Sequence, residues 1–327
     1  MSLLPEIDAT AELDSRPSRM PGLAALRATS GFQRGMLAVG AGIVAVFVML
    51  AVFAPLIAPY GFNDAASHGV DFGTLQAPSA AHWFGTTVGG EDVLSRVVYG
   101  ARTALEVIVL AVTLSMIVGV PLGLVSGYRG GWLDRVLVLL TDALFSFPPL
   151  LLAIVISISV AGGQSSSTGG ILSAAIAITV VYVPQYFRLV RNATVAAREE
   201  PYVEAARALG APPWVIVTRY LFTNVVQTVP VIATLNAGDA ILTLAGLGFL
   251  GFGIEPSAAA EWGYDLNKAL SDTAAGIWWT GTFPGIAIVL LVLGVTLVGE
   301  SLNDVLNPLL RTTKVRPVEL PPRDDRP

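Results

Sequence analysis

Residues 36–58 read MLAVGAGIVAVFVMLAVFAPLIA and include no charged side chain. A helix of about 20 apolar residues crosses the roughly 30 Å hydrocarbon core of a bilayer, so this run is long enough to span a membrane. A mostly polar stretch of 35 residues precedes it, whereas a cleaved signal peptide carries a shorter apolar core nearer its start. The run therefore predicts a retained membrane-spanning helix.

Five more apolar runs follow along the chain, at 104–126, 136–161, 169–187, 222–247 and 281–299. Lipid cannot satisfy backbone N–H and C=O groups, so a span is a helix or a strand of a closed barrel, and barrel strands alternate apolar with polar residues. These runs are continuous and do not alternate. The sequence predicts an all-α integral membrane protein with six transmembrane helices over residues 36–311, flanked by polar tails at 1–35 and 312–327.

The composition excludes several classes of protein. Hydrophobic residues make up 54% of the 327, and the charged share of 13% is about half of what a soluble domain carries. The chain has no cysteine for a disulfide or thiolate site and only two histidines, too few for most histidine-rich metal sites. Its net charge of −5 and the lack of a basic stripe argue against a nucleic-acid partner. Because neither a Walker A nor an HExxH motif is present, we predict no catalytic residues, no cofactor and no nucleotide or metal site in this chain.

The Lys and Arg side chains fall unevenly on the two sides of a six-helix topology. Sixteen of the 19 lie in the tails or in loops on the same side as the tails, and the other side receives only Arg96, Arg102 and Lys268. Cytoplasmic loops are enriched in Lys and Arg. Both termini are therefore predicted to be cytoplasmic, with residues 59–103 as an external loop and 188–221 as the largest internal cytoplasmic loop.

Within this cytoplasmic loop, residues 198–210 read REEPYVEAARALG. Pro201 favours the start of a helix, and Gly210 favours a left-handed cap at its end, with two prolines just beyond. A second helix is expected to rise toward the membrane from Trp214. Tyr202, Ala206 and Leu209 are expected to share one face, which suits docking into a groove on a soluble partner. The alternative is a surface elbow whose charged side chains are merely solvated.

Seven segments, taken in order, resemble a known family: HWFGT (82–86), DVLSRVVYGARTAL (92–105), LGLVSGY (122–128), GGWLDRVL (130–137), TDALFSFPPLLLAI (141–154), YVEAARALGA (202–211) and WWTGTFPGIAI (278–288). The family is that of the permease subunits of bacterial ABC importers, in its peptide and nickel branch. The resemblance implies a type I permease fold in the bacterial inner (plasma) membrane. It also implies four kinds of partner: a second homologous permease, two ATPase subunits that bind ATP and Mg²⁺, a substrate-binding protein outside the membrane, and the lipid itself.

The family's cytoplasmic motif, Glu-Ala-Ala followed by Gly, is matched by Glu204, Ala205, Ala206 and Gly210. In the family this loop is a coupling helix that sits in a cleft of the ATPase, which would place Tyr202 and Leu209 in the same contact. Relatives commonly read Ile-Leu-Pro after the elbow. This chain has Leu221, Phe222 and Thr223 there, so the second helix is expected to reach the membrane without the usual break.

The external loop departs from the family pattern as well. Relatives often place an Asp after the Gly-Thr pair and an Arg before the next Asp, where this chain has Thr87 and Glu91. Compared with these relatives, Thr87 and Glu91 remove a local Asp–Arg ion pair and make the external loop more acidic. In the family this loop helps form the face on which the binding protein docks; the alternative is a solvated loop with His82 and Trp83 at the membrane interface.

Two carboxylates lie inside the predicted spans, where charge is costly and marks candidate functional residues. Asp142 has a family counterpart, and we expect a structural or gating role facing the bundle interior. Asp239 lies where relatives have a small residue. Either it lines the translocation pathway and attracts the amino terminus of a peptide, or it packs against a partner subunit.

Two functions remain after these observations. In the first, the chain is a permease subunit of an ATP-driven importer of dipeptides or oligopeptides, with nickel or another small solute as alternative cargo. In the second, it is a proton-coupled secondary transporter that acts alone, with Asp142 and Asp239 as proton carriers. Such transporters often carry inverted repeats of broken helices, and we find no convincing repeat here.

Overall fold

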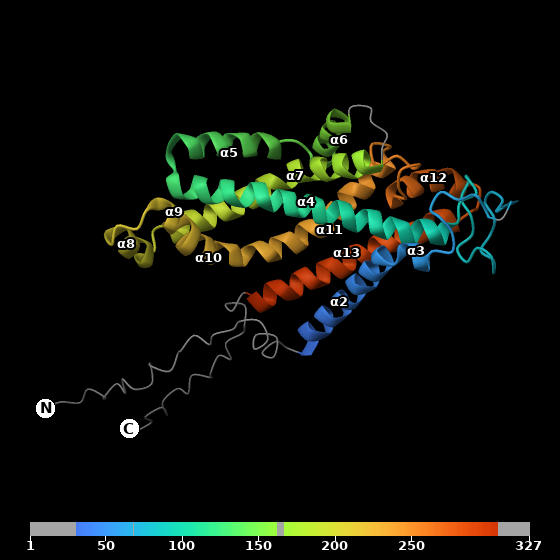
Figure 1. Cartoon of the computed structure of the whole chain (residues 1–327), viewed down its shortest axis with the longest axis horizontal. Coiled ribbons are helices and arrows are strands. Elements are labelled where there is room, and N and C mark those ends of the chain that lie inside the picture. The colour runs from blue at the N-terminus through green and yellow to red at the C-terminus, as the bar shows by residue number, and fades with distance from the viewer. Residues whose placement is uncertain (1–30, 68, 162–166, 307–327) are drawn as a thin grey trace, which may run out of the picture.

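The computed structural model describes residues 31–67, 69–161 and 167–306 (Figure 1). The elements before residue 198 are α2 (Gly31–Val52), α3 (Ala54–Ile57), β1 (Ala66–Ser67), β2 (Val70–Asp71), α4 (Val93–Arg129), α5 (Gly131–Phe145), α6 (Pro149–Ala161) and α7 (Ser167–Ala197). The elements that follow are α8 (Pro201–Ala208), α9 (Pro213–Val215), a π-helical turn η1 (Ile216–Leu221), α10 (Phe222–Val225), a 3₁₀ turn η2 (Val226–Thr228), α11 (Val229–Phe249), α12 (Trp262–Ala274) and α13 (Trp279–Leu306).

Among the described residues, five helical stretches are long and apolar enough to cross a membrane: Gln33–Val52, Val93–Arg129, Gly170–Ala197, Pro213–Phe249 and Trp279–Asn303. The prediction of a helical membrane protein is confirmed. The predicted run at 136–161 is different, because α5 and α6 meet at a bend of 99° and only together count as a sixth span. Pro148 and Pro149 explain the break, since neither has an N–H to continue the helix. The predicted tail at 312–327 and the first 30 residues lie outside the described residues.

The tightest helix pair is α4 with α7. One face of α4 carries a small residue at every fourth position, which lets the two backbones approach closely. The stripe comprises Ala111, Ser115, Gly119, Gly123 and Gly127, all buried. A Cβ on Gly123 would lie 2.7 Å from the carbonyl oxygen of Phe187, so no larger residue fits without moving α7.

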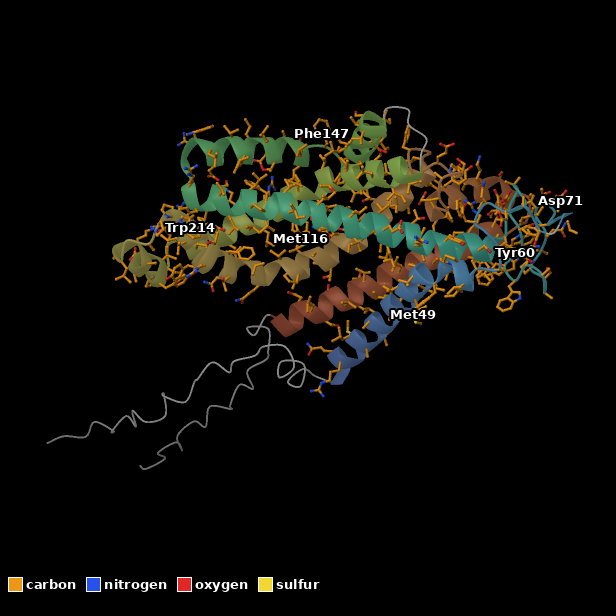
Figure 2. All side chains as sticks on the ribbon, in the orientation of Figure 1. Met49, Tyr60, Asp71, Met116, Phe147 and Trp214 are labelled. Carbon is orange, nitrogen blue, oxygen red and sulfur yellow. The ribbon has the colours of Figure 1, made fainter. Side chains whose placement is uncertain are left out.

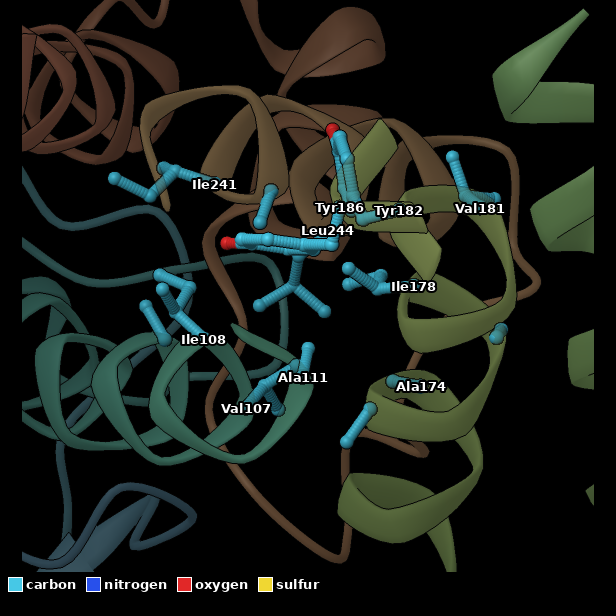
Figure 3. Packing of buried hydrophobic residues seen from close by; sticks show 14 of the residues in the cluster. Val107, Ile108, Ala111, Ala174, Ile178, Val181, Tyr182, Tyr186, Ile241 and Leu244 are labelled. Carbon is cyan, nitrogen blue, oxygen red and sulfur yellow. The ribbon is translucent and has the colours of Figure 1, made fainter. Parts of the chain in front are cut away.

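Helix α11 completes this core. Figure 3 shows Val107 of α4, Ile178 of α7 and Leu244 of α11 converging on one buried cluster. Hydroxyls at the α4–α7 contact are satisfied within their own helices: Ser115 Oγ donates to Ala111 O at 2.7 Å and Thr179 Oγ1 to Ala175 O at 2.7 Å. The core therefore contains polar groups without leaving these donors unpaired.

The two ends of the bundle differ in composition. Helix α8 and the elbow after it form one end, which we call the α8 end, and the loop before α4 together with α12 forms the opposite one, the α12 end (Figure 1). Figure 2 places Trp214 at the α8 end and Tyr60 and Asp71 at the α12 end. Helices α2 and α13 pack along each other, with the start of α2 and the end of α13 directed toward the α8 side.

The helix after the elbow runs without interruption from Pro213 to Phe249, in agreement with the expectation drawn from residues 221–223. It is not regular throughout. The N–H of Phe222 donates to Val217 O, five residues back, which makes a π-helical turn. A 3₁₀ turn follows at η2, which ends two residues before Pro230, and Pro230 has no N–H to donate to this turn.

Candidate functional site

The short helix α8 begins and ends as local chemistry dictates. Pro201 occupies its first position, where a missing N–H has no cost, and Glu200 before it is extended with φ −73° and ψ 144°. At the other end the N–H of Ala211 donates to Ala206 O at 3.0 Å and that of Gly210 to Arg207 O at 2.9 Å. This pair of bonds is a Schellman motif, which satisfies carbonyls that the helix leaves open.

Gly210 takes a φ of +79°, as the sequence predicts for a left-handed cap. A Cβ built at this position meets no atom within 4 Å. Glycine is therefore required here by backbone conformation and not by space. The elbow it forms turns the chain from α8 into the long helix that begins at Pro213.

One face of α8 is bound to the rest of the chain. Val203 and Ala206 are buried in the same cluster as Ile216 and Leu221 of η1. The amide of Asn224 donates to the hydroxyl of Tyr202 at 2.9 Å. Of the three residues predicted to share one docking face, Ala206 is only 5% exposed because its own chain packs against it, whereas Tyr202 and Leu209 are exposed. Docking through this face stays a prediction.

The opposite face of α8 is open. Glu204 and Ala205 are exposed, and Leu209, the residue directly after the helix, is 88% exposed. Arg207 is also exposed, with its guanidinium 5.6 Å from the ring centre of Tyr128 at the end of α4. The elbow thus presents an apolar tip beside charged side chains on a helix anchored from behind.

Polar bonds join the helix ends that surround α8. Arg191 of α7 holds Asp134 of α5 in a bidentate pair, with its Nε 2.5 Å from Oδ1 and its Nη2 2.7 Å from Oδ2. Ser126 of α4 donates to the same Asp134 at 2.6 Å, and Arg198 donates to Gly127 O at 2.9 Å. These bonds tie the ends of α4, α5 and α7 into one unit next to the elbow.

Asp142 does not stand alone. Its Oδ1 accepts a hydrogen bond from Arg188 of α7 at 2.6 Å, and both side chains are about half exposed. The same guanidinium lies over the Phe145 ring, 4.0 Å from its centre. The pair joins α5 to α7 close to the bend at Phe147, which Figure 2 labels.

Asp239 is exposed on α11, and its carboxylate makes no hydrogen bond to the residues that the structure describes. Its carbonyl accepts from Thr243, whose hydroxyl lies 3.2 Å from that of Tyr182. Asp142 and Asp239 therefore occupy different helices with different neighbours. No contact of the described residues brings these two carboxylates together.

The loop at the α12 end is ordered by buried polar contacts. His82 Nδ1 lies 2.9 Å from the Asp92 carboxylate, which also caps α4 by accepting from the N–H of Ser95 at 2.8 Å. The rings of Phe84 and Phe283 stack with centres 3.9 Å apart. Helix α4 begins at Val93, within the predicted external loop 59–103, and continues through the span without a break.

Sequence reasoning missed a set of buried charges at this end. Arg96 of α4 pairs with Asp265 of α12, with Nε and Nη2 at 2.9 and 2.7 Å from Oδ1, and both residues are buried. Glu261 is also buried and caps α12 by accepting from the N–H groups of Gly263 and Tyr264. Burial raises the pKa of Glu261 to about 8, against the two backbone bonds that lower it. The spacing of Glu261, Asp265, Lys268 and Asp272, at four, three and four residues, is the helical signal that could have identified this face.

Comparison with known proteins gives consistent results. A family model described as "Binding-protein-dependent transport system inner membrane component" matches residues 119–312. The dipeptide transport system permease protein DppC of Alkalihalophilus pseudofirmus is 39% identical over 277 residues, which is 84% of this chain and 86% of the relative. The glutathione transport system permease proteins GsiD of Pectobacterium atrosepticum and Escherichia coli are both 36% identical, over 86% of this chain and 90% and 89% of their own lengths.

Proposed function

The chain belongs to the family of binding-protein-dependent transport system inner membrane components, and we propose that it is a permease subunit of an ATP-driven importer of small peptides. In this proposal it forms half of a translocation pathway, and a second homologous permease forms the other half. Two partner ATPase subunits bind ATP and Mg²⁺, and a binding protein delivers the cargo. The relatives' names favour dipeptides or glutathione-sized peptides over nickel as the cargo.

The observation that carries the proposal is the form of α8. Its inner face is fixed by Val203 and Ala206, while its outer face leaves Leu209 uncovered. An exposed apolar side chain on an anchored helix is suited to a pocket on another protein. Glu204, Ala205 and Gly210 of the family motif lie on this same short segment, and Tyr202 ties it to Asn224.

The connections of α8 also suit transmission of force. The helix is joined through three residues to α7 and through four to the stretch Pro213–Phe249, and both of these continue into membrane spans. A partner that moved α8 would therefore displace two spanning helices directly. The polar ties around Asp134 would carry the displacement to α4 and α5 as well.

Asp142 and Asp239 have the weaker role in this proposal. Asp142 holds α5 against α7 through Arg188, which suits a gating or structural contact. Asp239 remains a candidate for the pathway wall or for packing against the second permease. A proton-coupled transporter acting alone is not favoured, since it gives no reason for the exposed α8 and its family motif.

The test is co-purification from gently solubilised membranes with a tag on this chain. Leu209→Asp is expected to lower recovery of the ATPases at least tenfold and to abolish ATP-driven peptide uptake, while the second permease is still recovered. Leu270→Asp provides the matched control, because Leu270 is an exposed leucine at the α12 end. Full ATPase recovery with Leu209→Asp contradicts the proposal, as does proton-driven uptake by the purified wild-type chain without ATP.

A further inference from the structure

A cavity of about 250 Å³ lies at the α12 end, between the loop before α4, helix α12 and the start of α13. Its wall includes Glu91, Arg96, Asp265, Lys268, Asp272 and Thr280. A space of this volume holds several water molecules. It is larger than a bare ion requires and large enough for a small organic molecule.

Apart from Nη2 of Arg96, which lies 2.7 Å from Oδ1 of Asp265, two buried polar atoms on residues of this wall make no hydrogen bond to the described residues. They are Oδ2 of Asp265 and Oγ1 of Thr280, on residues that are 8% and 4% exposed. Hydroxyls further inside a helix donate to the carbonyl four residues back, as Thr282 does to Trp278 O at 2.7 Å. Thr280 lies in the first turn of α13, so it has no such helical carbonyl behind it. Both atoms therefore have unused hydrogen-bonding capacity, on residues that line the cavity.

Asp272 adds a second unusual carboxylate. It is 5% exposed, and no hydrogen bond or ion pair joins its side chain to the part of the chain that the structure describes. It also lies in the last turn of α12, which ends at Ala274. The C-terminal end of a helix is negative, so a carboxylate there is unfavourable unless a cation is near. Asp265 lies two turns earlier on the same face of α12.

The charges of the wall favour a positive ligand. Arg96 is paired with Oδ1 of Asp265. The other charged residues of the wall are one cation, Lys268, and two carboxylates, Glu91 and Asp272. Lys268 lies 5.4 Å from the ring centre of Tyr264, and Glu91 already accepts a hydrogen bond from the hydroxyl of Thr87. No three His, Asp or Glu side chains among the described residues are grouped as ligands for a metal ion. An organic cation that donates hydrogen bonds fits this wall better than a divalent ion, which needs six or more oxygen ligands.

We propose that this cavity binds the primary ammonium group of a small peptide, with Oδ2 of Asp265 and the carboxylate of Asp272 as its acceptors. The hydroxyl of Thr280 accepts a further ammonium hydrogen. A carboxylate at the other end of the peptide then lies within the field of Lys268. That the ammonium group belongs to a peptide follows from the proposed function. That the cavity binds an ammonium group at all is argued from the residues of the cavity alone.

The test is direct binding to the full-length chain in lipid nanodiscs, measured by calorimetry and by ligand-observed NMR. The probes are Ala-Ala, N-acetyl-Ala-Ala, which lacks the ammonium, and n-butylammonium, which mimics a lysine side chain. Ala-Ala and n-butylammonium are expected to bind, and N-acetyl-Ala-Ala is not. Asp272→Asn is expected to raise the Kd of Ala-Ala at least tenfold and Thr280→Val several-fold. Asp71→Asn, an exposed carboxylate at the same end, leaves the Kd unchanged.

Three results overturn the proposal. They are equal binding of the acetylated peptide, a Kd that neither Asp272→Asn nor Thr280→Val changes, and binding of n-butylammonium without Ala-Ala. The last result assigns the cavity to a lysine of a docked protein. If Asp272→Asn fails to fold, Thr280→Val still tests the proposal, because it replaces only a hydroxyl with a methyl group. Because this assay needs no ATPase, its failure alongside intact ATP-driven uptake removes the cavity proposal and leaves the proposed function standing.

Discussion

The α8 end and the α12 end of this bundle treat the same kinds of residue in opposite ways. At the α8 end two charged side chains are exposed on a helix of eight residues, and so is the leucine that directly follows it. At the α12 end the ion pair of Arg96 with Asp265 and the carboxylates of Glu261 and Asp272 are buried. Under the proposed function the exposed side chains of the α8 end contact a partner, whereas the buried charges of the α12 end depend on pairing within this chain. Stability should therefore depend mainly on the α12 end and assembly on the α8 end.

The largest effect is expected from breaking the buried ion pair. Arg96→Leu leaves Asp265 as a buried, unpaired carboxylate and should lower the free energy of unfolding by about 3–5 kcal/mol. Thermal and denaturant unfolding in nanodiscs measure the loss. Arg102→Leu is the control, since Arg102 and Glu106 form an exposed pair, worth about 0–1 kcal/mol. The double variant Arg96→Leu/Asp265→Leu should recover most of the stability, and equal losses for Arg96→Leu and Arg102→Leu contradict the comparison.

A second test uses pH. The pKa of Glu261 is raised by burial to about 8 from an ordinary 4.5, so the folded chain binds more protons than the unfolded chain between these values. The contribution of Glu261 to the free energy of unfolding is therefore greatest below pH 4.5 and falls as pH rises toward 8. The slope of this term reaches at most about 1.4 kcal/mol per pH unit.

Glu261→Gln should remove that slope, so that unfolding temperatures at pH 5 and pH 8 differ less than in the wild type. Glu255→Gln changes an exposed carboxylate at the same end and should keep the wild-type profile. A profile for Glu261→Gln that matches the wild type would show that the carboxylate is not desolvated.

A smaller loss is expected at Gly248, which lies against Glu261. A Cβ at this position would stand 1.5 Å from Oε2 of Glu261, so Gly248→Ala forces the buried carboxylate to move. Overpacking of this kind costs about 1–3 kcal/mol in unfolding free energy. Gly42→Ala is the control, because a Cβ on this helical glycine meets nothing within 4 Å. Equal unfolding temperatures for Gly248→Ala and Gly42→Ala would contradict the close packing of Gly248 against Glu261.

The smallest effect on stability is expected at Gly210. Space is available there, and only the φ of +79° opposes a side chain, so Gly210→Ala should cost about 1–2 kcal/mol. Gly210→Asn should cost less, since asparagine tolerates the left-handed conformation. Unfolding in nanodiscs measures stability, and recovery of the ATPases measures assembly. If Gly210→Ala lowers the free energy of unfolding as much as Arg96→Leu does, stability does not depend mainly on the α12 end.

The sequence could predict features that depend on residues close together in the chain, but not contacts between residues far apart in the chain. The start of α8 at Pro201 and its cap at Gly210 depend on neighbouring residues, and both are found where the local pattern places them. The pairing of Arg96 with Asp265 joins positions 169 residues apart, and that of Asp142 with Arg188 joins positions 46 apart. No local pattern specifies such partners. The burial of Ala206 was also missed, because it depends on how η1 folds back against α8.

The bend between α5 and α6 is an intermediate case. The prolines at 148 and 149 indicate where the helix ends, but hydropathy merges the two segments into one run because both are apolar. The angle of 99° is set by what each half packs against, and α6 contacts α7 and α11. Composition could therefore predict the number of apolar runs, but not the angle at which α5 and α6 meet.

The close fit of α4 to α7 gives the bundle a mechanical property. Helix α7 has 31 residues, which at 1.5 Å each makes a rod about 46 Å long. The stripe of small residues from Ala111 to Gly127 fixes α4 beside it over about half that length. A tilt of about 5° about one end of such a rod moves the other end by about 4 Å. A small rotation at the elbow is thus converted, by length alone, into a displacement as large as an amino-acid side chain on the far side of the membrane.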